Sequence, residues 1–327
     1  MSPHIRSFNA GPMRRAGRAL LLSAALAVTA GCDRLQRALN KETPVVSSDL
    51  GWQVDSTLMA RKPSILFRVY KDSAGTLVAP VATIGTEGFR QIVMGRRGWR
   101  AFDVEYLQAG HTLSAIRDGR PNGTITLTRG MWEGGSQLDS LEGCSRLIPA
   151  GQTAPGQGVL LAMTGAQPPQ RADATLSGDV VASAMATVPT LIAPSAGIPV
   201  GTLSKYVRDV HQLNTGVSRT PTLLAIYTDT VQVADSVRSI TQRPKQFLVV
   251  LDKGLYGFKP TYVFSTLGTR ETPPPMEWLG YLDIDRDGRA ELFFGSRFDA
   301  KHPTTIALRF ATDAWTERFN QLLRCQG

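Results

Sequence analysis

Short runs of β-branched and aromatic residues, separated by Gly, Asp and Ser, recur along most of this 327-residue chain and restrict what it can fold into. Runs of this length and composition are typical of β-strands. In residues 48–150 they are Ile65–Tyr70, Leu77–Ile84, Phe89–Met94, Ala101–Tyr106, Thr112–Arg117 and Thr124–Thr128. The last two flank a segment of Asp, Gly, Pro and Asn, which is the composition of a hairpin turn. We therefore expect an antiparallel β domain, organised as a meander, over residues 48–150.

The C-terminal part, residues 201–327, repeats the strand pattern and adds two helical ones. Strands are expected at Thr222–Tyr227, Gln246–Leu251, Thr261–Thr266, Trp278–Leu282, Glu291–Phe294 and Thr305–Phe310. Helical spacing of apolar residues predicts a short helix over Leu203–Leu213. It predicts a second helix from Trp315 through Phe319 to Leu322 and Leu323, with Thr312 or Asp313 as its cap. The expected fold is mainly β, with sandwich-like antiparallel domains and a short C-terminal helix.

Residues 151–200 differ from both β-rich parts because they are rich in Gly, Ala, Pro and Thr. Such a composition is typical of loops and linkers. We interpret this segment as a connecting region between an N-terminal β domain at 48–150 and a C-terminal β domain at 201–327.

An apolar run of Leu, Ala and Val ends at Cys32, and the charged residues before it are all arginines. A membrane-spanning helix would need about 20 apolar residues, and a buried helix would need a polar face, so the run fits neither. It is typical of a secretion signal. Its small residues before a cysteine resemble the bacterial lipoprotein signal, in which the cysteine is lipidated and begins the mature chain. The resemblance implies a signal peptide at 1–31, lipid on Cys32 and a polar tether at 32–47.

Three alternatives at the N-terminus stay open. Translation could begin at Met13, which is followed by two arginines and the apolar run. A conventional cleavage near Cys32 would leave that residue without lipid. Asp33 favours the inner membrane under the enteric sorting rule, but that rule differs between bacterial groups, so either membrane remains possible. In each case we expect an exported protein, held at a bacterial membrane and facing the periplasm or the cell surface.

Export changes how the charge and the cysteines are interpreted. Residues 1–31 hold four of the 36 basic residues and none of the 27 acidic ones, so the net charge falls from +9 to +5. This excess is too small to indicate nucleic acid binding. Lipidation of Cys32 would leave Cys144 and Cys325 in an oxidising compartment, where they could form a disulfide. Two separate buried thiols are the alternative.

Residues 283–291 carry acids at alternate positions, and they lie between two expected strands. Carboxylates spaced like those of Asp283, Asp285 and Asp287 can converge on one cation, and Gly288 permits the sharp turn that this requires. The other interpretation is a simple hairpin turn at Asp287 and Gly288, with the remaining acids in solvent. Mutual repulsion of the carboxylates favours a cation, although nearby arginines could offset part of it.

The carbonyl of Arg289 and the carboxylate of Glu291 could add further ligands. Because the twelfth position of the loop is Phe294, the loop is not an EF-hand, which needs an acid there. The spacing instead resembles the FG-GAP or VCBS calcium loop known from β-propeller blades. That resemblance implies a structural Ca²⁺ site formed by Asp283, Asp285, Asp287, Arg289 and Glu291. It covers about 30 residues with no second copy, so a complete propeller is not expected.

The sequence has no motif of a common hydrolase, neither a Gly-x-Ser-x-Gly elbow nor a His-Glu-x-x-His zinc motif. His111, His211 and His302 are isolated, and we expect structural or surface roles for them. The basic segment Gly95–Arg100 is expected to be a solvated turn with a packed Trp99, with anion binding as the alternative.

These observations predict a membrane-anchored envelope lipoprotein with a non-catalytic binding or structural role. Its partners would be the membrane and an envelope protein or polymer, and nucleic acid is not expected. Two alternatives remain: a hydrolase of an envelope polymer, and a subunit of an envelope assembly or transport complex.

Overall fold

The structure is a computed structural model that describes residues 63–72, 75–85, 88–92, 96–130, 148–151, 158–165, 174–196, 203, 205–236, 239–266, 275–296 and 305–321. All of them belong to the compact unit Ser48–Gly327. The predictions for the signal peptide, the tether, Cys32, Cys144, Cys325 and His302 fall outside the described residues. Within the described part, no helix has the length and apolar character needed to cross a membrane.

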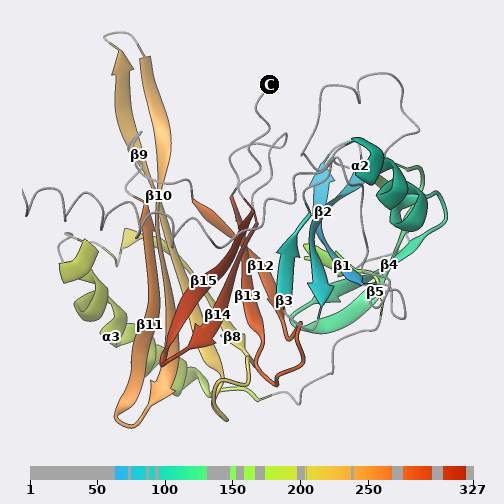
Figure 1. The fold of residues 1–327 in the computed structure, drawn as a ribbon. Coiled ribbons are helices and arrows are strands. Elements are labelled where there is room, and N and C mark those ends of the chain that lie inside the picture. The colour runs from blue at the N-terminus through green and yellow to red at the C-terminus, as the bar shows by residue number, and fades with distance from the viewer. Residues whose placement is uncertain are drawn as a thin grey trace, which may run out of the picture. The chain divides into compact units, whose positions relative to one another are not determined.

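The described part is mainly β, as the sequence predicts, and its strands form three antiparallel sheets (Figure 1). We refer to them as sheet A (β1 to β7), sheet B (β8 to β11) and sheet C (β12 to β15). No β-propeller occurs among these strands. The domain division at residues 150 and 201 stays a prediction.

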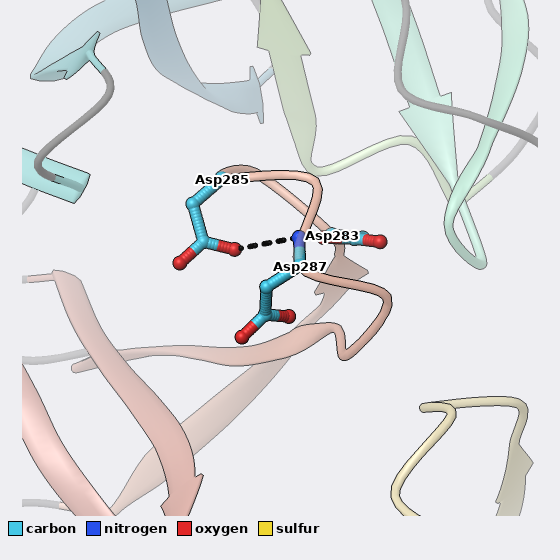
Figure 2. Close-up of side chains that lie close together, drawn as sticks. All are labelled: Asp283, Asp285 and Asp287. Atoms are coloured by element: carbon cyan, nitrogen blue, oxygen red, sulfur yellow. Dashed lines mark hydrogen bonds between the residues drawn. The ribbon is translucent and has the colours of Figure 1, made fainter.

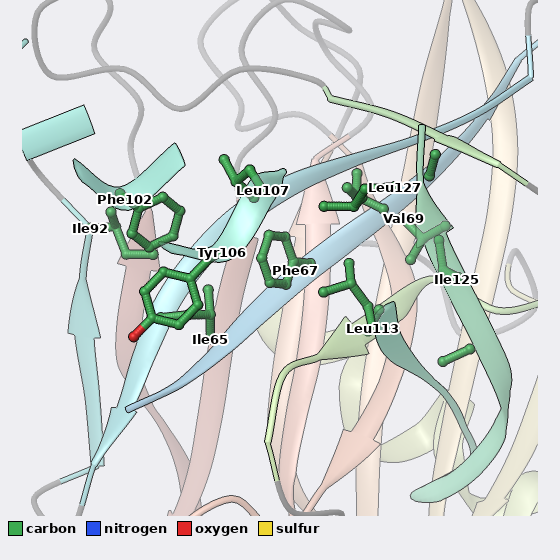
Figure 3. Close-up of a cluster of buried hydrophobic side chains, with 14 of the residues drawn as sticks. Ile65, Phe67, Val69, Ile92, Phe102, Tyr106, Leu107, Leu113, Ile125 and Leu127 are labelled. Carbon is green, nitrogen blue, oxygen red and sulfur yellow. The ribbon is translucent and has the colours of Figure 1, made fainter. Parts of the chain in front are cut away.

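Sheet A has the strand order β1-β7-β4-β5-β6-β2-β3, and β1 also pairs with β2. Its strands are β1 (Ser64–Asp72), β2 (Gly75–Gly85), β3 (Gly88–Gln91), β4 (Thr112–Arg117), β5 (Arg120–Leu127), β6 (Ile148–Gly151) and β7 (Leu161–Met163). Alternate residues of β1, namely Ile65, Phe67 and Val69, join Leu113 and Ile125 in one buried cluster (Figure 3). The sheet curls around this core, because β1 meets both β7 and β2.

Residues 96–107 are helical, which corrects the strand predicted at Ala101–Tyr106. Helix α2 (Arg96–Phe102) runs into a π-helical turn at Asp103–Leu107. The aromatic residues of this segment are three and four positions apart, so they share one helical face. Phe102 packs edge-on against Trp99 at 5.5 Å between ring centroids and lies 4.9 Å from the ring of Tyr106. Trp99 is buried as expected, but its backbone is helix instead of a solvated turn.

The predicted hairpin between β4 and β5 is confirmed, with a shorter turn than the sequence indicated. Asp118 and Gly119 form the turn with φ of 49° and 71°. Two successive positive φ values are those of a type I′ turn, which matches the twist of the adjoining strands.

Sheet B has the order β11-β10-β9-β8. Its strands are β8 (Val207–Leu213), β9 (Thr222–Ser236), β10 (Ser239–Gly254) and β11 (Gly257–Thr266). Helix α3 (Gly178–Ala196) packs Val188 and Ile192 against Leu223 and Phe247 of this sheet (Figure 1). The sequence predicted a connecting region there from its content of Gly, Ala, Pro and Thr, and the helix includes the helix-breaking residues Pro189 and Pro194. Burial of the apolar face compensates for them.

The helix predicted over Leu203–Leu213 is wrong, since residues 207–213 form β8 and pair with β9. Val210 belongs to the cluster under α3, whereas Leu213 belongs to the cluster on the opposite face of sheet B. Residues three positions apart face opposite sides in a strand and similar sides in a helix. The apolar residues therefore serve two cores, and their apparent helical spacing is coincidental.

Sheet C is a meander of β12 (Met276–Leu282), β13 (Glu291–Ser296), β14 (Thr305–Ala311) and β15 (Ala314–Gln321). Both of its faces are buried. On one face Leu279 and Phe293 pack with residues of sheet A, and on the other Leu292 and Phe294 pack with residues of sheet B. Sheet C thus supplies residues to the cores it shares with both other sheets.

The predicted C-terminal helix is wrong where the structure describes it, because residues 314–321 form β15. Glu317 pairs with Leu308 and Phe319 with Ala307, so Arg318 is an extra residue in the strand. Because of this irregularity, Trp315 and Phe319 face opposite sides of sheet C and belong to different buried clusters. The helical spacing of Trp315 and Phe319 is therefore coincidental, because the two residues serve different cores.

Candidate metal centre

Three aspartates meet in the loop between β12 and β13 (Figure 2). Asp283, Asp285 and Asp287 each offer a carboxylate oxygen, and these oxygens lie within 4.8 Å of one another. Ligand oxygens stand about 2.3–2.6 Å from a calcium ion, so two ligands of one ion can be up to about 5 Å apart. The spacing is compatible with a shared cation, and the triad could hold a metal ion.

The loop backbone brings the three side chains together. Arg286 and Gly288 have positive φ values of 62° and 86°, which reverse the chain within a few residues. The N–H of Asp287 donates to Oδ1 of Asp285 at 3.2 Å, and the N–H of Gly288 donates to Oδ2 of Asp283 at 3.2 Å. Such local bonds are typical of Asp in tight turns. They hold the carboxylates of Asp285 and Asp283 against the backbone of the loop.

A hydrogen bond and a buried side chain anchor this loop to the rest of the fold. The N–H of Ala290 donates to the carbonyl of Thr215, which follows β8, at 2.7 Å. Asp283 is buried, with 5% of its surface exposed, at the end of β12. The two ends of the loop are therefore buried, while its tip at Arg286 to Arg289 is exposed.

Arg309 on β14 contacts two of the three aspartates. Its Nη2 lies 2.7 Å from Oδ2 of Asp285 and 2.6 Å from Oδ2 of Asp287. Partial burial alone would raise the pKa of Asp287, but hydrogen bonds from Arg309 and from the N–H of Arg289 hold that pKa below its usual value. The side-chain hydrogen bond to Asp287 in turn raises the pKa of Arg309. The guanidinium is thus an internal cation in the loop.

Glu291 lies outside the group of three carboxylates, at the first position of β13. Its Oε2 accepts a hydrogen bond from the N–H of Ile284 at 3.2 Å. Burial, together with the charge of Asp285, raises the pKa of Glu291 to about 8, against the lowering effect of that hydrogen bond. In this structure Glu291 therefore stabilises the start of the loop through its hydrogen bond with Ile284.

Arg289 is connected to the triad through its backbone, since its N–H donates to Oδ1 of Asp287 at 2.7 Å. The sequence therefore predicted the three aspartates that meet, and the use of Arg289 and Glu291 as ligands stays a prediction. It missed Arg309, which is 22 residues beyond Asp287. No local pattern marks that arginine, because strand pairing alone brings it to the loop.

Two of the three isolated histidines are described, and neither belongs to the triad. The N–H of His111 donates to the carbonyl of Gln108 at 3.0 Å, and its own carbonyl accepts from Leu127. His211 has its Nε2 3.0 Å from Oδ2 of Asp209, and its ring centroid is 6.0 Å from that of Trp278. Both sets of contacts are compatible with structural roles.

Comparison of the chain with protein-family models, with curated proteins and with solved structures finds no match. The function must therefore be inferred from the site and the sequence.

Proposed function

We propose that this protein is an envelope lipoprotein, anchored through lipid on Cys32, with a non-catalytic binding or structural role and a calcium ion that stabilises the loop between β12 and β13. The observation that carries the calcium part is the convergence of Asp283, Asp285 and Asp287 within 4.8 Å. The lipoprotein part rests on the signal-like N-terminal sequence. Calcium is far more available outside the cytoplasm, so the two parts support each other.

Calcium suits the donor set better than a transition metal would. All three side chains offer hard carboxylate oxygens, and neither described histidine joins them. Calcium takes six to eight oxygens in flexible geometry, so loop carbonyls, water and a reoriented Glu291 could complete its shell. Binding requires Arg309 to leave the two aspartates that it contacts, because a divalent cation would replace its charge.

A structural role follows from where the loop begins and ends. It connects two strands of sheet C, whose faces contribute to the cores shared with sheets A and B. An ion in the loop would restrain the β12–β13 connection and with it the packing on both sides. A catalytic role would need a general acid or base beside the ion, whereas the loop carboxylates are engaged with backbone N–H groups and Arg309.

The calcium site is tested on the chain from residue 32 onward, which retains the compact unit Ser48–Gly327. Thermal unfolding is measured with calcium, with magnesium and with chelator. We expect calcium at a hundredfold excess over its Kd to stabilise the protein by about 2.7 kcal/mol. Isothermal titration calorimetry should give one calcium per chain.

Two variants make this test specific. Asp285→Ala should abolish the difference between calcium and chelator, whereas Asp229→Ala, an exposed acid on β9, should retain it. Equal unfolding temperatures in calcium and in chelator for the parent protein would rule out the calcium site.

The membrane anchor is tested separately in the bacterium. Metabolic labelling with a radioactive fatty acid should mark the parent protein and leave Cys32→Ala unlabelled. Fractionation should then find the parent in the membrane. A labelled Cys32→Ala variant, or an unlabelled parent, would contradict the proposed anchor without bearing on calcium.

A further inference from the structure

The turn that joins β10 to β11 exposes two large apolar side chains. Leu255 and Tyr256 are 95% and 103% exposed relative to the free residue, more than the other exposed large apolar side chains of the described residues. They stand between Gly254 and Gly257, at the end of β10 away from its connection to β9 (Figure 1). The hairpin thus ends in a fully solvated Leu-Tyr pair.

The backbone conformation of the turn does not explain why Leu255 and Tyr256 occur there. Two other short hairpin turns of the protein, Asp118-Gly119 and Thr312-Asp313, use polar residues or glycine with positive φ at both positions. Those residues favour the type I′ turn that suits antiparallel strands. Leu255 and Tyr256 are not among the residues with positive φ. Neither residue type is favoured in turns, so local folding gives no reason for their presence.

The strands below the turn hold the exposed pair in place. Next to it, Asp252 is buried and accepts hydrogen bonds from the Thr261 hydroxyl at 2.6 Å and from the indole N–H of Trp315 at 2.8 Å. Phe258 packs against the cluster under α3, and Nζ of Lys253 lies 5.5 Å from the centroid of its ring. These contacts fix the base of the hairpin and leave Leu255 and Tyr256 at the exposed end.

The exposed charges that adjoin the pair in sequence are both positive. Lys253 and Lys259 flank it on the two strands and are both exposed, and residues 253–259 include no acid. The stem of Lys259 lies against Gly254, 3.7 Å from the position that a Cβ there would take. Lysine side chains of this kind place their aliphatic stems on apolar surface and their charges in the polar layer above it.

We propose that the β10–β11 turn is a membrane-contacting tip, which inserts Leu255 and Tyr256 into the headgroup region of an anionic phospholipid bilayer. Tyrosine is enriched at this depth, because its ring is apolar and its hydroxyl can remain hydrated. Leu255 would reach the acyl boundary, and Lys253 and Lys259 would face the lipid phosphates. This contact is distinct from the lipid on Cys32 and does not depend on calcium.

The test uses the chain from residue 32 with Cys32→Ser, so that no attached lipid can bind the membrane. Co-sedimentation is measured with vesicles of phosphatidylcholine and phosphatidylglycerol in equal parts, and with vesicles of phosphatidylcholine alone. We expect binding to the mixed vesicles and weaker binding to the neutral ones. Failure to bind the mixed vesicles would overturn the proposal while leaving the Cys32 anchor and the calcium site unaffected.

The tip is isolated with the paired substitution Leu255→Ser and Tyr256→Asn, which replaces both apolar side chains with polar residues that are common in turns. Because both side chains are fully exposed, the unfolding temperature should stay close to that of the parent. Binding to the mixed vesicles should fall at least roughly tenfold, because the lower end of the free energy gained by burying one leucine side chain corresponds to that factor. Leu191→Ser, at an exposed apolar residue of α3, is the matched control and should bind as the parent does. Unchanged binding by the tip variant, or an equal loss in the control, would refute the proposal.

The lysines are tested with Lys253→Gln and Lys259→Gln together. Binding to the mixed vesicles should fall roughly fivefold for each lysine, and binding to neutral vesicles should not change. Lys71→Gln with Lys205→Gln, two exposed lysines outside the hairpin, is the charge-matched control. An equal loss in both pairs would show that net charge attracts the protein and would contradict a specific tip.

Discussion

Nη2 of Arg68 on β1 lies 2.7 Å from Oε2 of Glu277 on β12, so a charged pair joins sheet A to sheet C. The arginine side chain is 4% exposed and the glutamate 27%. The guanidinium also lies over the ring of Tyr70, 4.7 Å from its centroid. Burial raises the pKa of that tyrosine, against the lowering effect of Arg68, so the phenol stays neutral and the ring face remains available to the cation.

Removing the carboxylate should destabilise the protein more than an ordinary surface ion pair would. Glu277→Ala leaves a buried guanidinium without this counter-charge, and we expect a loss of about 2–3 kcal/mol in the free energy of unfolding. Chemical denaturation measures it. The mutant cycle with Arg68→Met should give a coupling free energy of at least about 1 kcal/mol. Additive effects of the two substitutions would show that the contact contributes nothing to the sheet A and sheet C junction.

Several strands were predictable because the pattern of apolar residues within each short segment indicates a strand. Apolar residues at alternate positions of β9, β10 and β13 face two cores, and a strand that is buried on both sides is a continuous apolar run in sequence. The segment Phe247–Leu251 is such a run, and it is fully buried. The position and type of these strands therefore followed from composition alone.

The errors arose where tertiary context overrides a local pattern. Helix α3 contains Pro189 and forms because sheet B offers its apolar residues a surface to pack on. Trp315 and Phe319 have helical spacing, but pairing with β14 makes the segment a strand and the extra residue Arg318 places them on opposite faces. Likewise, the loop of three aspartates was visible in the sequence, whereas the contact of Arg309 depends on the register of β14 beside β13.

Arg309 should compete with calcium for the loop. Because its guanidinium contacts Asp285 and Asp287, Arg309→Gln removes a cation that calcium would otherwise have to displace. The arginine side chain is 33% exposed, so we expect a gain in calcium affinity of only about fivefold. Isothermal titration calorimetry measures the affinity, and Arg318→Gln, an exposed arginine on β15, is the control. Unchanged or weaker binding in Arg309→Gln would show that the guanidinium does not oppose the ion.

The stability of the metal-free protein should decrease as the pH rises. Burial raises the pKa of Glu291 from 4.5 to about 8, so between these values the folded state holds a proton that the unfolded state has released. Stability from this group is complete below the unfolded pKa and is lost as the pH approaches the folded pKa. The change should be roughly 4 kcal/mol, measured by urea denaturation in chelator across this range.

Glu291→Gln is the control for this pH dependence, because the amide does not ionise and still accepts the hydrogen bond from Ile284. Its stability should vary less between the two pH values than that of the parent protein. If the two proteins show the same pH profile, another group is responsible and Glu291 is ionised in the folded state.

Gly119 and Gly288 offer a matched pair for the contact between the β4–β5 turn and β12. Both have positive φ, 71° and 86°, so alanine is strained at each of them. A Cβ on Gly119 would lie 2.9 Å from Cε2 of Tyr281, whereas one on Gly288 would meet nothing within 4 Å. We expect Gly288→Ala to lower the free energy of unfolding by about 1 kcal/mol, and Gly119→Ala by about 2–3 kcal/mol, because Tyr281 must also move. Thermal and urea unfolding in chelator give both values. Equal losses of unfolding free energy in the two variants would mean that the Tyr281 side chain moves away without cost. The β4–β5 turn would then not be packed tightly against sheet C.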